Sequence, residues 1–394
     1  CGGAIGLNVA LRSGASEKHP VGATVASSVP PMAARRREVA AWVDRGLLQL
    51  AGSELMDSSS GAELLAPQVE PGVGGAGSAG KPTVTSPSND NAEHEPETLS
   101  EQRDEFYRLL AYGGGHGAFQ IEQIRAIVEA SPYFGQGNPL VTRHPMTREE
   151  CRRRREKMPV VGDDARICGS PNMVALYDPD REEPAHAKLC IDQFEFPNLA
   201  CEYPVVWVRA SEASRICHIL DKRLCDAHEW EGACAGKLRS PAKEYESWVN
   251  RLNAEYFHNQ SRVILWATRQ KPDARTCGTG ALKSPGCVDA SWEHCGTNSY
   301  PAGAFPRCVS AFGVYDLHGN VAEHMNLPLN ETQLGSLGGS GETEMKGSWF
   351  AFDEYHPHPD DCRWRAPAWH ATPIESESSH FNYHLGFRCC RDLD

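Results

Sequence analysis

The chain has 394 residues, a length that suits one large domain or two ordinary ones. Its formal net charge of −13 at pH 7 argues against nucleic acid as a partner, because phosphate binding needs a basic face. No run of roughly 18 apolar residues is present, so the sequence predicts no membrane-spanning helix.

Residues 1–98 are interpreted as a lipid-anchored tail and linker with a short helix. The stretch CGGAIG at Cys1 resembles the mature start of a bacterial lipoprotein, whose N-terminal cysteine is acylated. A chain boundary that fell on a cysteine by chance is the alternative. The resemblance implies attachment to a membrane through lipid on Cys1, in the bacterial cell envelope, on an outer membrane facing the periplasm or the cell surface. A helix is expected within residues 30–55, and the Gly-, Ser- and Pro-rich residues 56–99 predict a flexible tether.

Residues 99–147 are expected to form a helical hairpin. Ser100 is a suitable cap for the first helix, and Phe106, Leu109 and Leu110 give it one apolar face. A second helix is expected to end before Pro132. The arginine-rich residues 147–157 are interpreted as a solvated helix face or a docking patch.

Residues 148–394 are expected to form one compact, irregular α+β domain, because short strand patterns and many turns replace long helical patterns. Alternating polarity predicts a strand within residues 187–198. Two helices are expected next, within residues 209–220 and 226–236. Asp226 and Glu229 have the spacing of a capping box for the second.

The cysteines indicate a disulfide-rich domain. Of the 15 cysteines, all except Cys1 lie at or beyond Cys151, which leaves an even number in this domain. Such usage is typical of an oxidising compartment, and the absence of Cys-x-x-Cys pairs argues against a zinc site. The adjacent Cys389 and Cys390 cannot readily bridge each other, so each is expected to have a distant partner.

Five segments occur in an order and spacing that resemble the formylglycine-generating enzymes, also called the sulfatase-modifying factor family. They are CIDQFEFPN, YPVVWVRASEASRICHILDKRLCDAHEWEGACAG, FGVYDLHGNVAEH, KGSWF and GFRCC. The resemblance covers about residues 163–394. It implies the family's compact mixed fold, which is related to C-type lectin-like folds.

The resemblance implies a calcium site in the segment GVYDLHGNVAEH. Asp316 and Glu323 would supply carboxylate oxygens, and Gly319 and Val321 would supply backbone carbonyls, the oxygen ligands that Ca²⁺ prefers. The alternative is an Asp-capped turn followed by a surface glutamate.

The resemblance also implies disulfide pairings. Cys217 would pair with Cys389, which ties the first of the two helices to the last strand. Cys190 would pair with Cys390 if the first and last strands lie side by side. The usual partner position of Cys234 holds Ala366. Cys362 could therefore pair with Cys234, or it could turn into the gap left by the missing thiol. Sequence alone leaves the connectivity open.

Enzymes of this family oxidise a substrate cysteine to formylglycine with O₂ and Cu(I) held by two thiols. These thiols lie three and eight residues beyond a serine, which is Ser348 here. Ala351 occupies the first thiol position. Beyond a lengthened segment, Asp361 aligns with the second, and Cys362 is its neighbour. The catalytic site is therefore expected to be degenerate. Ala322 and His324 also replace tryptophans that flank the calcium-loop glutamate in the family.

The lengthened segment HPHPDD places His356, His358 and Asp360 close together, beside Asp361 and Cys362. Histidine and carboxylate side chains suit zinc or iron. A solvated loop stiffened by proline is the alternative.

Three functional hypotheses follow, and enzymatic activity is the less favoured. The first is a noncatalytic binding or scaffold domain in the cell envelope, with an envelope protein or glycan as partner. The second is a formylglycine-generating oxidase with an altered copper site. The third is a lectin-like module for glycan or peptidoglycan, suggested by Trp349, Trp364 and Trp369.

Overall fold

The computed structural model describes residues 95–158, 162, 164–244, 251–368 and 371–393. The described residues all belong to one compact unit, Asn89–Asp394. The acylated Cys1, the helix within residues 30–55 and most of the tether lie outside the described residues and stay predictions. None of the described helices is long and apolar enough to cross a membrane.

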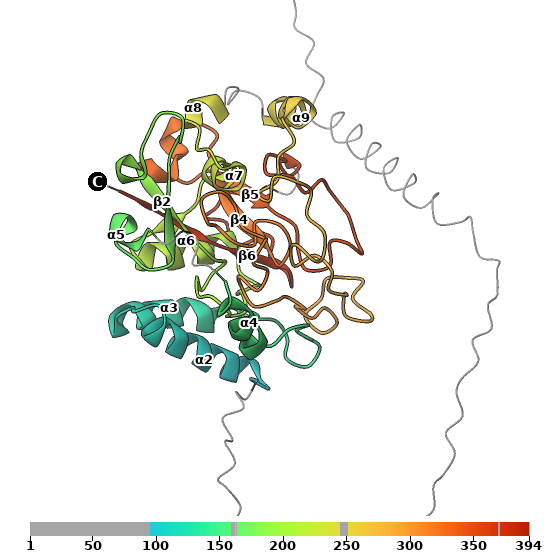
Figure 1. Ribbon diagram of the computed structural model, residues 1–394. Coiled ribbons are helices and arrows are strands. Elements are labelled where there is room, and N and C mark those ends of the chain that lie inside the picture. Colours follow the sequence, from blue (N-terminus) through green and yellow to red (C-terminus); the bar gives the residue numbers. More distant parts are fainter. Residues whose placement is uncertain (1–94, 159–161, 163, 245–250, 369–370, 394) are drawn as a thin grey trace, which may run out of the picture. The chain divides into compact units, whose positions relative to one another are not determined.

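The predicted α+β class is confirmed, with short helices and strands joined by long irregular segments (Figure 1). The α-helices are α2 (Leu99–Tyr112), α3 (Ala118–Ala130), α4 (Arg148–Arg155), α5 (Ala165–Cys168), α6 (Ala210–Ile219), α7 (Ala227–Ala235), α8 (Pro241–Glu244) and α9 (Arg251–Ser261). Short 3₁₀ helices occur at Pro184–His186, Glu331–Gln333 and Gly335–Leu337.

The helix starts follow local capping chemistry. Thr98 rather than Ser100 caps α2, because its hydroxyl accepts a hydrogen bond from the Glu101 N–H at 3.2 Å. At α7, Glu229 accepts a hydrogen bond from the N–H of the N-cap residue Asp226 at 2.8 Å, as the sequence predicts.

Two small sheets form the centre of the domain. One has the order β1-β2-β7-β3 and the other the order β5-β4-β6. The first is antiparallel, whereas β4 and β6 of the second run parallel. The strands are β1 (Met173–Leu176), β2 (Leu189–Asp192), β3 (Arg223–Leu224), β4 (Ala322–Leu327), β5 (Glu342–Lys346), β6 (Leu385–Phe387) and β7 (Cys389–Asp392). Arg388 is the single residue between β6 and β7, so it lies where the chain passes from one sheet to the other.

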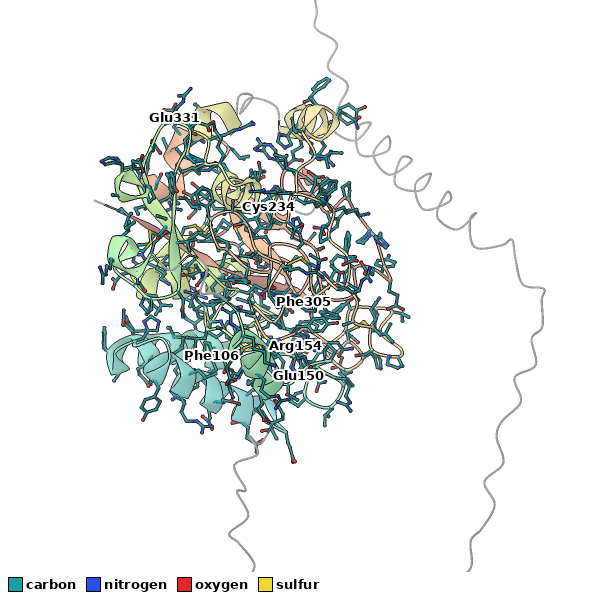
Figure 2. The ribbon with its side chains drawn as sticks, viewed as in Figure 1. Phe106, Glu150, Arg154, Cys234, Phe305 and Glu331 are labelled. Carbon is teal, nitrogen blue, oxygen red and sulfur yellow. A yellow bond between two sulfur atoms is a disulfide. The ribbon has the colours of Figure 1, made fainter. Side chains whose placement is uncertain are left out.

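The hairpin α2–α3 shares its hydrophobic core with the rest of the domain. Phe106 and Leu110 of α2 and Ile124 of α3 pack in one buried cluster with Phe196 and α6. The Phe106 ring lies 5.9 Å from that of Phe196, at the junction between hairpin and domain (Figure 2). The arginine-rich helix α4 places the Glu150–Arg154 ion pair on its surface, which agrees with a solvated face (Figure 2).

Seven disulfides use all fourteen cysteines from Cys151 onward. The pairs are Cys151–Cys201, Cys168–Cys190, Cys217–Cys389, Cys225–Cys390, Cys234–Cys362, Cys277–Cys308 and Cys287–Cys295. The bridges of Cys217 and Cys234 agree with the pairings that the resemblance implies. The adjacent Cys389 and Cys390 each have a distant partner.

The expected Cys190–Cys390 bridge is wrong, although β2 and β7 are neighbours. In their antiparallel pairing Cys390 lies opposite Ile191, whereas Cys190 lies opposite Arg391. Successive side chains of a strand point to opposite faces of the sheet, so Cys190 and Cys390 are on different faces. Cys390 therefore pairs with Cys225 on one face, and Cys190 pairs with Cys168 on the other.

Candidate functional site

The four expected calcium ligands, Asp316, Gly319, Val321 and Glu323, lie in the interior, in and after the loop before β4. Gly319 has φ +81°, and a Cβ there would lie 2.7 Å from the carbonyl of Gly278, so no other residue fits. Glu323 is only 1% exposed, which rules out the alternative of a surface glutamate.

Glu195, Asp316 and Glu323 form a buried acidic cluster beside Arg388. Arg388 donates from Nε and Nη2 to the two carboxylate oxygens of Glu323, both at 2.6 Å. Burial, followed by the charges of Asp316 and Glu323, raises the pKa of Glu195 well above its ordinary value. Burial also raises the pKa of Asp316 to about 6. If all three carboxylates are ionised, they carry three negative charges, and the single positive charge of Arg388 does not compensate them.

The positions where the family resemblance places two thiols hold none. Ala351 is fully buried. Asp361 is paired with Arg262, whose Nε and Nη2 lie 3.0 Å and 2.7 Å from its oxygens. Cys362, the sulfur nearest these positions in sequence, is bonded to Cys234. The expected degenerate site is therefore occupied by an ion pair and a disulfide.

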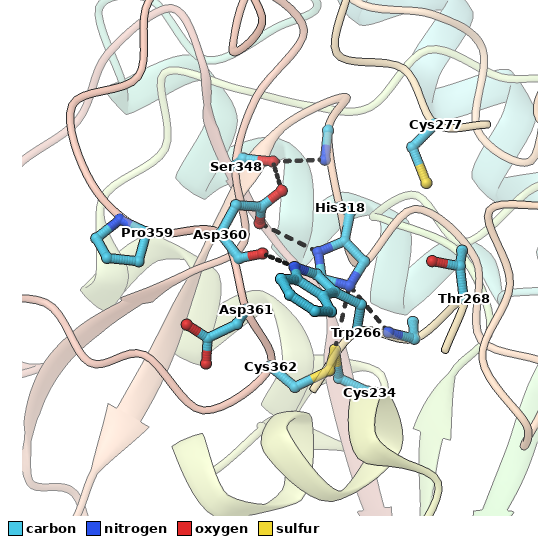
Figure 3. Close-up of polar contacts among 12 residues, drawn as sticks. Cys234, Trp266, Thr268, Cys277, His318, Ser348, Pro359, Asp360, Asp361 and Cys362 are labelled. Atoms are coloured by element: carbon cyan, nitrogen blue, oxygen red, sulfur yellow. Dashed lines mark hydrogen bonds and ion pairs between the residues drawn. A yellow bond between two sulfur atoms is a disulfide. The ribbon is translucent and has the colours of Figure 1, made fainter. Parts of the chain in front are cut away.

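A chain of hydrogen bonds joins Ser348, Asp360 and His318 (Figure 3). The Ser348 hydroxyl donates to Asp360 Oδ2 at 2.9 Å and accepts from the Gly319 N–H at 2.8 Å. The Ala267 N–H donates to His318 Nε2 at 3.0 Å, so Nε2 carries no proton. His318 Nδ1 then donates to Asp360 Oδ1 at 3.1 Å.

This chain of hydrogen bonds does not have the arrangement of a nucleophile and its imidazole base. In a Ser–His–Asp triad the imidazole lies between hydroxyl and carboxylate and takes the hydroxyl proton. Here the carboxylate of Asp360 lies in the middle, and His318 makes its contacts on the far side (Figure 3). The arrangement therefore fixes the orientation of His318 and gives Ser348 a carboxylate, not an imidazole, as its hydrogen-bond acceptor.

The expected metal ligands of the HPHPDD segment do not converge. The His358 ring stacks on Trp364 at a centroid distance of 4.1 Å, and His356 is exposed. Asp360 is engaged with Ser348 and His318 as described above. Within the described part of the chain, the groups of three side chains able to share one metal ion do not include His356, His358 or Asp360.

The two residues that stand in place of the family's tryptophans are buried in β4. Ala322 is fully buried, and His324 Nε2 lies 3.0 Å from the carbonyl of Val208. Burial lowers the pKa of His324 to about 4, so the imidazole is neutral at physiological pH. These residues fill the interior and offer no charge to a ligand.

Sequence reasoning missed three residues that organise this region: Glu195, His318 and Arg388. A signal was present for two of them. Glu195 stands among aromatic residues in QFEF, and Arg388 interrupts the apolar segment GFRCC. A charged side chain within such an apolar segment is expected to be buried and therefore to need a partner of opposite charge. His318 had no such signal, because its partner Asp360 is 42 positions away.

A groove of about 650 Å³ lies on α3, α6, β3 and the glycine-rich residues 335–340. Its volume is in the range of small-molecule sites. Ile127, Ile219, Leu224 and Ile374 form apolar walls. The Ser348–Asp360–His318 chain does not line it.

The comparison with protein families agrees with the sequence resemblance. Residues 182–393 match the model of the family described as sulfatase-modifying factor enzyme 1-like domain. The structure of PvdO from Pseudomonas aeruginosa is 16% identical, with a TM-score of 0.31, over 56% of this chain and 91% of that one. The crystal structure of CarF is 13% identical, with a TM-score of 0.32, over 56% of this chain and 97% of that one. No curated protein matches the chain.

Proposed function

The chain belongs to the sulfatase-modifying factor enzyme 1-like family. We propose that it uses the fold of this family as a noncatalytic binding or scaffold module. The observation that carries the proposal is the Cys234–Cys362 bridge. It removes the sulfur nearest the family's thiol positions, and Ala351 offers no replacement. Asp361 is a hard oxygen donor, poorly matched to Cu(I), and its charge is already used by Arg262.

The native protein is expected to form no formylglycine when it is incubated with Cu(I), O₂ and a cysteine-containing sulfatase peptide. Activation of O₂ next to the substrate thiol needs copper held by two thiolates. Mass spectrometry of the peptide follows the aldehyde, and a family enzyme with both thiols serves as the positive control. Turnover by the native chain would support instead the altered oxidase of the second hypothesis.

The proposal places the module in an oxidising compartment, as part of the cell envelope. Seven disulfides support this, because such bridges persist where thiols are not kept reduced. An envelope protein is favoured over a glycan as partner. Trp349 and Trp364 are only 4% and 8% exposed, so their rings are not free to stack on a sugar, whereas Trp369 lies outside the described residues.

Calcium in the loop before β4 is part of the same proposal. Asp316, Glu323 and the carbonyls of Gly319 and Val321 offer the hard oxygen donors that Ca²⁺ takes. Burial raises the pKa values of Glu195 and Asp316, and a divalent cation beside them would stabilise their ionised forms. Because Glu323 already binds Arg388, it would share its carboxylate between the guanidinium and the ion.

Removal of calcium with EGTA is expected to lower the melting temperature by several degrees, and added Ca²⁺ is expected to restore it. An ion that binds only the folded state at a concentration 100-fold above its Kd contributes about 2.7 kcal/mol. Differential scanning fluorimetry gives the shift, and an Asp316→Asn variant should show a smaller response. Equal melting temperatures in EGTA and in saturating Ca²⁺ would exclude the site.

A further inference from the structure

Two sulfur atoms and one imidazole nitrogen meet beside the Ser348–Asp360–His318 chain. His318 Nε2 lies 3.6 Å from Cys234 Sγ, and Cys234 is bonded to Cys362. The ligand atoms of these three residues all lie within 4.8 Å of one another (Figure 3). All three residues are buried, with exposures of at most 1%.

The distance between the nitrogen and the nearer sulfur suits a metal ion. A tetrahedral zinc site has bonds of about 2.3 Å to sulfur and about 2.0 Å to nitrogen, which place these two ligands about 3.5 Å apart. His318 Nε2 and Cys234 Sγ are already 3.6 Å apart, so neither needs to move far. The sulfur of Cys362 can reach the same metal ion once the Cys234–Cys362 bond is broken.

His318 already has the protonation state that a metal ligand needs. Its Nε2 carries no proton, and its Nδ1 donates to Asp360. Metal-binding histidines commonly donate their second ring N–H to a carboxylate, which fixes the ring and makes the nitrogen more basic. Ser348 in turn holds Asp360 in place. Zinc binding costs only the hydrogen bond from the Ala267 N–H.

We propose that reduction of the Cys234–Cys362 bridge converts this disulfide into a zinc site formed by Cys234, Cys362 and His318. A dithiol reductant supplies two electrons and two protons. The S–S bond breaks, two thiols form, and the reductant becomes a disulfide. Zn²⁺ then binds both sulfurs as thiolates and releases their two protons to solvent.

The charges of the three side chains favour a bound cation at this position once the bridge has been reduced. Two bare thiolates in the interior would be strongly destabilising, whereas Zn²⁺ with two thiolates and a neutral imidazole has no net charge. Three protein ligands leave one position of a tetrahedral ion for water. The site would form only under reducing conditions.

A second bridge provides a matched comparison. Cys225 and Cys390 also lie close to a third candidate ligand, Glu229. The Glu229 carboxylate, however, already accepts two hydrogen bonds from Arg223, at 2.7 Å and 2.8 Å. This group is therefore expected to bind zinc poorly when its bridge is reduced.

The test uses the full chain, reduced anaerobically with a phosphine, freed of reductant and titrated with Zn²⁺. Wild type and the Cys225→Ala/Cys390→Ala variant are expected to bind one tight equivalent. The Cys234→Ala/Cys362→Ala variant should lose it. His318→Gln, which keeps all cysteines, should also lose it, and Asp360→Asn should bind about 10- to 100-fold more weakly. In place of zinc, Co²⁺ should show thiolate charge-transfer bands in the wild type.

Several results would overturn the proposal. One is a reduced wild type that binds no zinc. Another is a His318→Gln variant that binds it as tightly as wild type, because unspecific binding by reduced or unfolded chains does not depend on this imidazole. Loss of the tight equivalent in the Cys225→Ala/Cys390→Ala variant would place the metal at the other bridge. Zn²⁺ should also raise the melting temperature of the reduced wild type and leave that of the reduced His318→Gln variant unchanged.

Discussion

Replacement of Arg388 by methionine is expected to lower the free energy of unfolding by about 3–5 kcal/mol, because it leaves a buried carboxylate without its partner. The guanidinium binds both oxygens of Glu323 and donates to the carbonyls of Asp192 and Tyr315 at 3.1 Å. Domains have about 5–15 kcal/mol of stability in total, so this loss removes a large share of it and should lower the urea midpoint of unfolding clearly. Urea unfolding followed by tryptophan fluorescence measures the loss.

Two further variants separate the lost charge from the lost side chain. Glu323→Gln combined with Arg388→Met should recover part of the stability, since no unpaired charge from this pair remains. Arg391→Met is the matched control on β7. Arg391 is partly exposed and donates only weakly, to the carbonyls of Cys168 and Gly169, so its loss should cost less than about 1 kcal/mol. An Arg388→Met protein as stable as Arg391→Met would contradict the assigned role.

Joint removal of the Cys217–Cys389 and Cys225–Cys390 bridges is expected to cost more than the sum of the two single removals. The bridges close chain segments of 172 and 165 residues. The two segments overlap almost completely, so either bridge alone closes nearly the same loop. While one remains, the other closes only a loop of roughly 10 residues, worth about 3 kcal/mol. Once both are gone, the next loop, closed through Cys234–Cys362, has roughly 40 residues, and the second loss costs about 4 kcal/mol.

Alanine replaces both cysteines of each pair in this comparison, and denaturant unfolding gives the three stability changes. Removal of the local Cys287–Cys295 bridge, whose ends are 8 residues apart, is the control. It should cost between about 2 and 3 kcal/mol, with no dependence on the other two bridges. Strict additivity of the Cys217–Cys389 and Cys225–Cys390 losses would show that the two bridges do not constrain the same loop.

The sequence predicted the helices α2, α3, α6 and α7 because their signals are local, but it gave bounds for only one strand, within residues 187–198. The capping residues and apolar faces of α2, α6 and α7 each lie within one short segment. The pairing of Cys190 failed for a different reason. Neighbouring strands were expected correctly, but the register between β2 and β7 depends on packing over the whole sheet. A shift of one residue decides which face a cysteine occupies.

The candidate site was predicted in part, for a similar reason. Aligned positions were enough to predict that Ala351 and Asp361 stand in place of thiols. Only the folded chain shows that Asp360 turns toward His318, and that His318 faces Cys234. These contacts span 42 and 84 positions, and no pattern within one segment encodes them.

The order of the bridges along the chain determines how this domain would respond to force. Tension applied at its two ends would pass from Cys151 directly to Cys201, and from Cys217 directly to Cys389. The segments between these cysteines, 50 and 172 positions long, would stay slack even after the domain had unfolded. Only the hairpin, the residues between the two bridges and the last few residues would stretch. Under load the domain would therefore extend much less than an unbridged chain of the same length.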